Sequence, residues 1–267
     1  MIRKPVVNGQ FYPNERHDLE KTIKSLTQDE SSKVNAKGII LPHAGYFYSG
    51  GVAVATVGGV LPRKRIIILG PNHTACDCGF SLWAKGEWEI PFGKIGIDED
   101  LAEKILKEGD WIKEDYLTHK LEHSLEVELP ILNYFFGEFK FVPIICPVSS
   151  LNIYQEVASQ LFKAVKKINE DVLLIASTDM THYEPDQAVR KKDRQAIESI
   201  INFDEEELIA KVCEEKITMC GVAPVAILIS CMKKLGAKKA QVRLYQTSAD
   251  ATGDCSSVVG YVGIIIK

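Results

Sequence analysis

The stretch Ile66-Ile67-Ile68-Leu69, followed by Gly70-Pro71-Asn72-His73, is the part of the sequence that most directly indicates the fold. An apolar run this continuous is typical of a central strand covered on both faces, whereas a half-exposed strand alternates apolar and polar residues. Val172-Leu173-Leu174-Ile175 repeats the pattern. In all, six strands are predicted, at Lys37–Pro42, Arg65–Gly70, Phe139–Cys146, Asp171–Ser177, Gln241–Gln246 and Ser257–Ile266.

Segments with helical periodicity lie between these strands, at Gly50–Leu61, Asp98–Glu108, Ser124–Phe136, Leu151–Ile168, Gln187–Ile201, Asp204–Glu215 and Val222–Leu235. Alternating strands and helices predict an α/β fold, a layered sandwich with a mostly parallel central sheet flanked by helices. Phe80–Ile90, with Trp83 and Trp88 beside Gly86, reads instead as a hairpin-like insertion.

The 267 residues contain no repeat, low-complexity tract or long linker, so a single domain over 1–267 is expected. A net charge of −4 gives no long-range attraction to nucleic acid or to an anionic membrane surface. No apolar run approaches the roughly 20 residues needed to cross a bilayer. The N-terminus lacks the features of a signal peptide, so a cytoplasmic protein with free thiols or metal-ligating cysteines is expected.

Residues that can bind a metal or act as an acid or base follow three of the predicted strands. His43 follows the first predicted strand, His73 follows the second, and Asp179 and His182 follow the fourth. The carboxyl ends of parallel strands are where α/β folds assemble sites, and imidazole is a frequent metal ligand and acid/base group. Each histidine alone could be a turn residue bonded to the backbone, but together they predict one site.

Asp179 and His182 are three residues apart. If residues 179–182 form a first helical turn, the two side chains share a face, and Asp179 can orient His182. The alternative is an N-cap at Thr178 or Asp179 with His182 exposed.

The segment His119-Lys120-Leu121-Glu122-His123 matches the inverted zinc-peptidase pattern H-x-x-E-H. The helical periodicity begins near Glu122, which places His119 before the helix and makes the match accidental. His123 is kept as a candidate site residue, with Glu126 about one turn further on.

Cys220 lies just before Gly221, at the start of a predicted helix, where a thiolate is stabilised by unpaired N–H groups. It is a candidate soft metal ligand or nucleophile. Cys146, Cys213 and Cys231 are expected to be small buried hydrophobic residues, and Cys76-Asp77-Cys78 is too tightly spaced for a zinc knuckle. P-loop, G-x-G-x-x-G and G-x-S-x-G patterns do not occur, which removes support for phosphoryl transfer and serine hydrolysis.

Five motifs occur in the order found in the Memo family, which the chain resembles over nearly its whole length. They are Pro42-His43-Ala44-Gly45-Tyr46, Gly70-Pro71-Asn72-His73, Glu122-His123-Ser124-Leu125-Glu126, Ser177-Thr178-Asp179-Met180-Thr181-His182-Tyr183 and Met219-Cys220-Gly221. The resemblance begins at Arg3-Lys4-Pro5-Val6 and extends to the last strand.

The resemblance implies a fold similar to class III extradiol dioxygenases, with iron or copper held by His43, His73 and Cys220. It also assigns Asp179, His182 and His123 to the same pocket. A functional link to a radical-SAM protein and an AMMECR1-like protein is implied as well. Because Cys220 stands where those dioxygenases use a carboxylate, ring cleavage does not follow from the resemblance.

The sequence therefore predicts a metal-binding redox enzyme with His43, His73 and Cys220 as ligands of iron or copper. His182, oriented by Asp179, would be the acid/base group, and His123 a second pocket donor. Two alternatives remain open at this point. One is a binding module for a small molecule or peptide, and the other is a zinc-dependent hydrolase.

Overall fold

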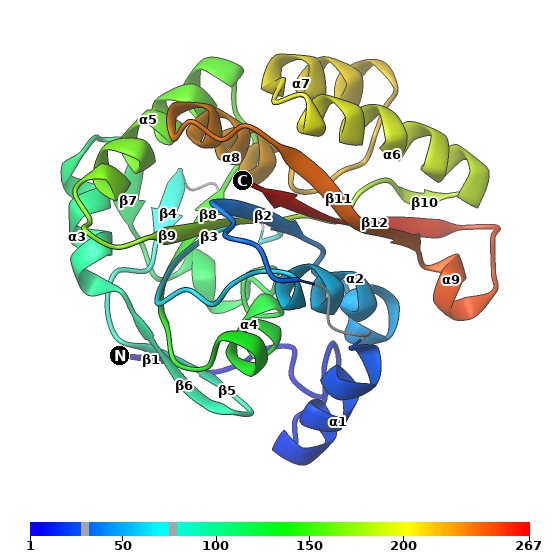
Figure 1. Ribbon diagram of the computed structural model, residues 1–267, viewed down its shortest axis with the longest axis horizontal. Coiled ribbons are helices and arrows are strands. Elements are labelled where there is room, and N and C mark those ends of the chain that lie inside the picture. Colours follow the sequence, from blue (N-terminus) through cyan, green and yellow to red (C-terminus); the bar gives the residue numbers. More distant parts are fainter. Residues whose placement is uncertain (28–31, 75–78) are drawn as a thin grey trace.

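The computed structural model describes residues 1–27, 32–74 and 79–267 (Figure 1). Its centre is one large mixed sheet. The strands are β1 (Ile2–Arg3), β2 (Gly38–Leu41), β3 (Arg65–Pro71), β4 (Phe80–Leu82), β5 (Glu87–Ile90), β6 (Gly93–Ile97), β7 (Ile112–Glu114), β8 (Lys140–Cys146), β9 (Val172–Ser177), β10 (His182–Glu184), β11 (Ala240–Thr247) and β12 (Val258–Ile266).

The main path through the sheet runs β1-β5-β6-β8-β3-β9-β2-β12-β10, with β11 paired to β12, and β4 paired to β7 and β8. The central strands β6, β8, β3, β9 and β2 are parallel to one another, and β12 closes this block antiparallel to β2. The predicted fold class, a mostly parallel sheet flanked by helices, is confirmed, and all six predicted strands are present.

Helices cover both faces of the sheet (Figure 1). They are α1 (Arg16–Leu26), α2 (Tyr46–Gly58), α3 (Glu99–Lys107), α4 (Glu128–Phe136), α5 (Leu151–Lys166), α6 (Asp186–Ile201), α7 (Glu205–Glu214), α8 (Val222–Lys234) and the short α9 (Ala249–Thr252), together with a 3₁₀ turn at Thr118–Lys120. None of the helices in the described residues has the length and apolar character to cross a membrane.

Successive residues of the central strands enter different cores, as the pleat of a strand requires. Ile67 and Leu69 of β3 pack into the core under α3, α5 and α8, whereas Ile66 and Ile68 pack into the core under α1, α2 and α4. A strand with an apolar layer on each side must be apolar at every position, which explains the continuous run Ile66–Leu69.

Three predicted segments differ from the structure. The helix predicted at Gly50–Leu61 is α2, which begins four residues earlier, at Tyr46, and ends at Gly58. Phe80–Ile90 is not a hairpin, because β4 pairs with β7 and β8 while β5 pairs with β1 and β6. The antiparallel hairpin is β5–β6, one strand further along. The helix predicted from Ser124 begins only at Glu128. Pro130 explains the delay, since proline is accepted in the first helical turn but would remove a hydrogen bond from the interior of a longer helix.

Gly221, the residue directly before α8, lies against the end of β9. A Cβ atom at Gly221 would lie 2.6 Å from the backbone oxygen of Ser177, at the end of β9. Cys220 precedes this contact directly, so the close approach also determines where its side chain lies.

We expect Gly221→Ala to lower the free energy of unfolding by about 1–3 kcal/mol, because the new methyl group meets backbone that cannot move aside. Denaturant unfolding measures the change. Gly96→Ala is the matched control, since the nearest atom to its added Cβ would be Lys140 Cγ at 3.9 Å. Equal stability of the two variants would contradict the close approach of α8 and β9.

Candidate metal centre

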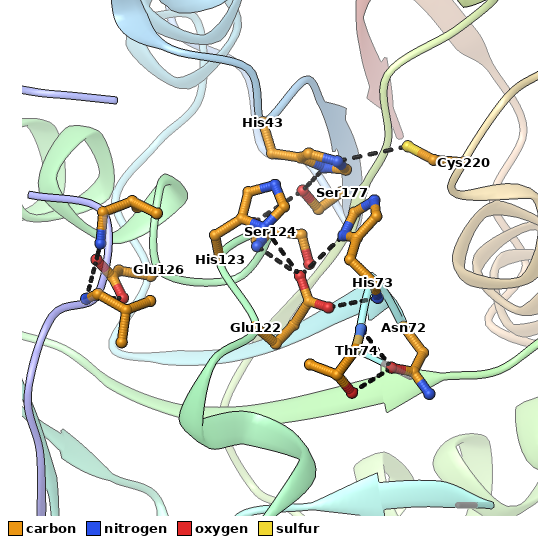
Figure 2. A network of polar contacts seen from close by, with 12 residues as sticks. His43, Asn72, His73, Thr74, Glu122, His123, Ser124, Glu126, Ser177 and Cys220 are labelled. Atoms are coloured by element: carbon orange, nitrogen blue, oxygen red, sulfur yellow. Dashed lines mark hydrogen bonds and ion pairs between the residues drawn. The ribbon is translucent and has the colours of Figure 1, made fainter. Parts of the chain in front are cut away.

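Three imidazoles meet at the carboxyl ends of the central strands (Figure 2). His43 follows β2, His73 follows β3, and His123 lies in the segment before α4. One nitrogen from each ring can be chosen so that all three lie within 4.8 Å of one another. The ring centroids of His73 and His123 are 4.7 Å apart, and that of His43 lies 5.2 Å and 5.6 Å from them. The predicted convergence of these histidines is therefore present.

Glu122 fixes the orientation of His73. Its fully buried carboxylate accepts hydrogen bonds from the backbone N–H of His73 at 2.6 Å and from the backbone N–H of Ser124 at 2.9 Å. It also contacts Nδ1 of His73 at 2.9 Å, which leaves Nε2 of that ring available (Figure 2). The second nearby imidazole is His123, whose Nδ1 lies 3.6 Å from the same carboxylate.

These contacts set the charge of the pair. Burial alone would raise the pKa of Glu122, but the hydrogen bond and charge of His73 and the backbone N–H donors lower it to about 2. Burial alone would lower the pKa of His73, and the hydrogen bond and charge of Glu122 reverse that effect and raise it. A carboxylate bonded to the far nitrogen of a histidine is the usual support of a metal-binding imidazole.

The other two imidazoles are kept neutral. Burial and the neighbouring His73 and His123 lower the pKa of His43 well below its ordinary value. The pKa of His123 is also lowered, by burial first and despite the opposing charge of Glu122. Neutral imidazole is the form that binds metals, so these two rings need lose no proton before binding near pH 7.

His43 is held from two sides. Its backbone N–H donates to Oδ1 of Asp179 at 2.9 Å, and its Nδ1 lies 2.8 Å from Oγ of Ser177. Ser177 in turn contacts the buried carboxyl group of Glu128, with 2.6 Å between Oγ and Oε1. The ring therefore presents Nε2 toward the other two histidines.

Cys220 lies beside His43, at 3.4 Å between Sγ and Nε2 (Figure 2). Its sulfur also accepts a hydrogen bond from the backbone N–H of Asp179 at 3.2 Å. Burial, followed by the nearby charge of Asp179, raises the pKa of this thiol, so its position before a helix does not make it a free thiolate. Cys220 is not a member of the group whose donor atoms all lie within 4.8 Å, which consists of the three histidines. Its role as a ligand stays a prediction.

Asp179 and His182 are arranged differently from the predicted helical turn. His182 begins strand β10, which pairs with β12, and helix α6 starts only at Asp186. The carboxylate of Asp179 accepts from the backbone of His43, and burial raises its pKa to about 7. Nδ1 of His182 is buried and has no hydrogen-bond partner among the described residues. The structure thus shows Asp179 supporting the turn of His43, while its predicted contact with His182 is not observed.

His119 lies outside the cluster, as expected for an accidental H-x-x-E-H match. It is fully buried, its Nε2 lies 3.1 Å from the backbone oxygen of Ser81, and its ring packs between Trp83 and Trp88. Burial lowers the pKa of His119 to about 3.

Glu126, expected near His123, instead binds the N-terminal segment. Its buried carboxylate pairs with Nη1 of Arg3 at 2.6 Å and accepts from the backbone N–H groups of Val6 and Val7. Arg3 also donates to the backbone oxygens of His119 and Glu122 and lies over the ring of Trp88. The segment that carries Glu122 and His123 is thereby fastened to the beginning of the chain.

The remaining cysteines divide into two groups. Cys146 and Cys231 are buried as predicted, but Cys213 is exposed, which corrects that expectation. Helix α7 packs against the core through the face that carries Leu208. Cys213 lies on a different face of this helix. Cys76 and Cys78 lie outside the described residues.

Three residues that support the histidines were not assigned these roles from sequence. In the sequence analysis Glu122 and Ser177 occur only as members of motifs, and Glu128 occurs in none of them. Glu122 directly precedes the candidate residue His123, and this position in the sequence could have indicated its role in supporting the histidines. No local pattern joins Ser177 to His43, which is 134 residues away.

We expect Glu122→Gln to lower the pKa of His73 below its ordinary value, because burial would then be opposed only by the smaller effect of the charge of Asp179. An NMR titration of the imidazole signals measures this pKa. Glu103→Gln, an exposed change on α3, serves as the control. A His73 pKa that stays raised in Glu122→Gln would show that Glu122 is not its charge partner.

Comparisons with known proteins agree with the motifs. Residues 3–265 match the family model described as Memo-like protein. A MEMO1 family protein of Methanococcus maripaludis strain C6 is 40% identical, with all of both chains covered. Another, from Aquifex aeolicus, is 40% identical over 99% of this chain and 98% of its own.

A solved structure supports the fold independently. An uncharacterized protein from Escherichia coli K12 superposes with a TM-score of 0.57 at 11% identity, over 87% of this chain and 100% of the other. That likeness concerns the architecture alone. The match along almost the full sequence, together with the two relatives at 40% identity, shows that this chain belongs to the Memo-like family.

Proposed function

We propose that this protein is a metal-dependent oxidoreductase that binds iron or copper at His43, His73 and His123, with Cys220 as a further donor. The observation that carries the proposal is the approach of three imidazole nitrogens within 4.8 Å of one another. The substrate would be a small molecule or a peptide, and the protein would act in the cytoplasm.

The residues present fit such an ion. Nδ1 of His43 faces Ser177 and Nδ1 of His73 faces Glu122, so both rings can offer Nε2 to a common point. The carboxylate of Glu122 supplies a negative charge directly behind two of the rings, which raises their basicity as ligands. His73 and His123 are only partly buried, so an ion and a substrate can approach from their side.

The sulfur donor of Cys220 supports iron or copper as the bound ion. A thiol 3.4 Å from Nε2 of His43 adds a soft donor to the imidazoles, and sulfur donors favour copper(I) and iron over magnesium or calcium. The ion would supply one-electron redox chemistry. The chain would supply proton handling at His182, whose Nδ1 has no partner within the described structure, and at Asp179, whose pKa is about 7.

A zinc-dependent hydrolase is the second candidate, favoured by the histidines themselves. Three histidine ligands with an open position are a known donor set of catalytic zinc. In that case Cys220 would not be needed as a ligand, and the H-x-x-E-H segment would still contribute only His123.

The first test is metal binding by protein purified without oxygen. Elemental analysis and titration with iron(II), copper(I) and zinc should show one tight site, and His43→Ala, His73→Ala or His123→Ala should each weaken it by more than about 100-fold. This loss exceeds the roughly 10–100-fold decrease in metal affinity that is usual when a residue hydrogen-bonded to a metal ligand is removed. His17→Ala, an exposed change on α1, is the control and should bind as the parent protein does.

Retention of full affinity in all three histidine variants would contradict the proposal. Tight zinc binding with no redox response would favour the hydrolase instead. Metal binding without oxygen uptake or substrate turnover after iron loading would favour a binding module on the same fold.

The second test asks whether Cys220 is a ligand. Because the pKa of its thiol is raised, Cys220 is protonated near pH 8 and must release one proton when it binds a metal. The neutral His43 and His123 release none, and any proton from His73 is released equally by the parent protein and by Cys220→Ser. Calorimetry in buffers of different ionisation enthalpy counts that proton. We expect about one fewer released proton for Cys220→Ser, and lower copper(I) affinity.

Cys231→Ser is the matched control, because this buried cysteine lies within α8 in the helix-covered core. It should change stability rather than proton release. Equal proton release by Cys220→Ser and the parent protein would assign the site to the histidines alone.

A further inference from the structure

Behind His43 lies a chain of buried polar groups whose members are distant in sequence. Nδ1 of His43 is 2.8 Å from Oγ of Ser177, and that oxygen is 2.6 Å from Oε1 of Glu128. The same hydroxyl oxygen lies 3.0 Å from the backbone oxygen of Ser124. Ser177 and Glu128 are fully buried, and His43 is 2% exposed.

We infer that Ser177, held in place by Glu128, positions His43 with a proton on Nδ1 and the lone pair of Nε2 directed at the metal centre. The inference deepens the proposed function and rests on it for the identity of the centre. It concerns the tautomer of the buried His43 imidazole, which can be determined whether or not a metal is bound.

The number of protons available for hydrogen bonds around Ser177 Oγ decides the tautomer of His43. A hydroxyl group donates one hydrogen bond and accepts two. The backbone oxygen of Ser124 can only accept, so it competes for the single hydroxyl proton. If Nδ1 of His43 were unprotonated, it would be a further acceptor competing for that same proton, and a buried acceptor would lose its donor.

A proton on Nδ1 removes His43 from this competition for either state of Glu128. Burial raises the pKa of Glu128 well above its ordinary value, which favours the neutral acid. A neutral Glu128 donates to Ser177 Oγ, and the Ser177 hydroxyl then donates to Ser124. An ionised Glu128 takes the Ser177 proton itself. In both cases Ser177 Oγ is left to accept from His43.

The contact at Nε2 of His43 is also consistent with a proton on Nδ1. Sγ of Cys220 is 3.4 Å from Nε2, and a protonated thiol can donate to an unprotonated nitrogen. The same lone pair on Nε2 is the one that a metal ion would take. Ser177 and Glu128 are therefore positioning residues, since they act on the centre only through His43.

The test is NMR of the metal-free protein labelled with ¹⁵N, in which long-range proton–nitrogen correlations distinguish the two tautomers of each imidazole. His43→Gln identifies the signals of His43 by their loss. We expect His43 of the parent protein to be in the Nδ1–H form. Ser177→Ala should shift it largely to the Nε2–H form, because Nδ1 then has no acceptor and Nε2 can face the sulfur.

Two matched variants separate positioning from general loss of stability. Ser230→Ala removes another buried serine whose hydroxyl donates to a buried glutamate, Glu205, at 2.8 Å. It should leave the His43 tautomer unchanged. Glu128→Gln should also keep the Nδ1–H form, because the amide N–H can donate to Ser177 Oγ in place of the carboxyl O–H.

The inference is overturned if metal-free His43 carries its proton on Nε2, or if Ser177→Ala leaves the tautomer as it was. Zinc titration of the same variants gives the second readout. We expect Ser177→Ala to weaken zinc binding about 10–100-fold and Ser230→Ala to have no effect. If the parent protein bound no metal, the proposed function would fail while the tautomer result stood, so the two failures are distinguishable.

Discussion

The in-register parallel pairing of β2, β9 and β3 is the constraint on which the site depends. Leu41 pairs with Ser177, and Leu69 pairs with Ala176, so these strands end at the same edge of the sheet. That register brings Ser177 beside His43, although the two residues are far apart in sequence. A slip of one residue would turn every side chain of a strand to the opposite face, so Ser177 would face away from His43 and the residues of the two cores would be exchanged. The geometry of the imidazoles is therefore maintained by the two apolar cores.

The fold could be predicted well because its strongest signals are local. A buried strand such as Val172–Ser177 is recognised by its continuous apolar residues. All six predicted strands, several of them runs of this kind, correspond to observed strands. Short strands such as β7 and β10 carry no such pattern and depend on their partners. The N-terminal end of α4 was placed too early because the apolar periodicity continues through Leu125, whereas Pro130 limits where the helix can start.

The site could be predicted only in part. His43 and His73 were recognised because each follows an apolar strand, and His123 was placed in the same pocket. The sequence analysis gives His123 the role of a second pocket donor rather than of a metal ligand, because no spacing in the sequence shows how close its ring lies to those of His43 and His73. Glu122, Ser177 and Glu128 support the rings through contacts across 49 to 134 residues of sequence. Buried polar groups find their partners in three dimensions, and a single sequence does not display those partners.

The bond between Arg3 and Glu126 has a consequence for the order in which the protein is made. Arg3 leaves the ribosome well before its partners at His119, Glu122 and Glu126, which follow 116 to 123 residues later. The partners of His43 come later still, Ser177 after 134 residues and Cys220 after 177. Contacts of such large sequence separation form late in folding. A growing chain thus exposes His43 and His73 long before their support exists, and the side chains around these histidines are complete only after Cys220 has been synthesised.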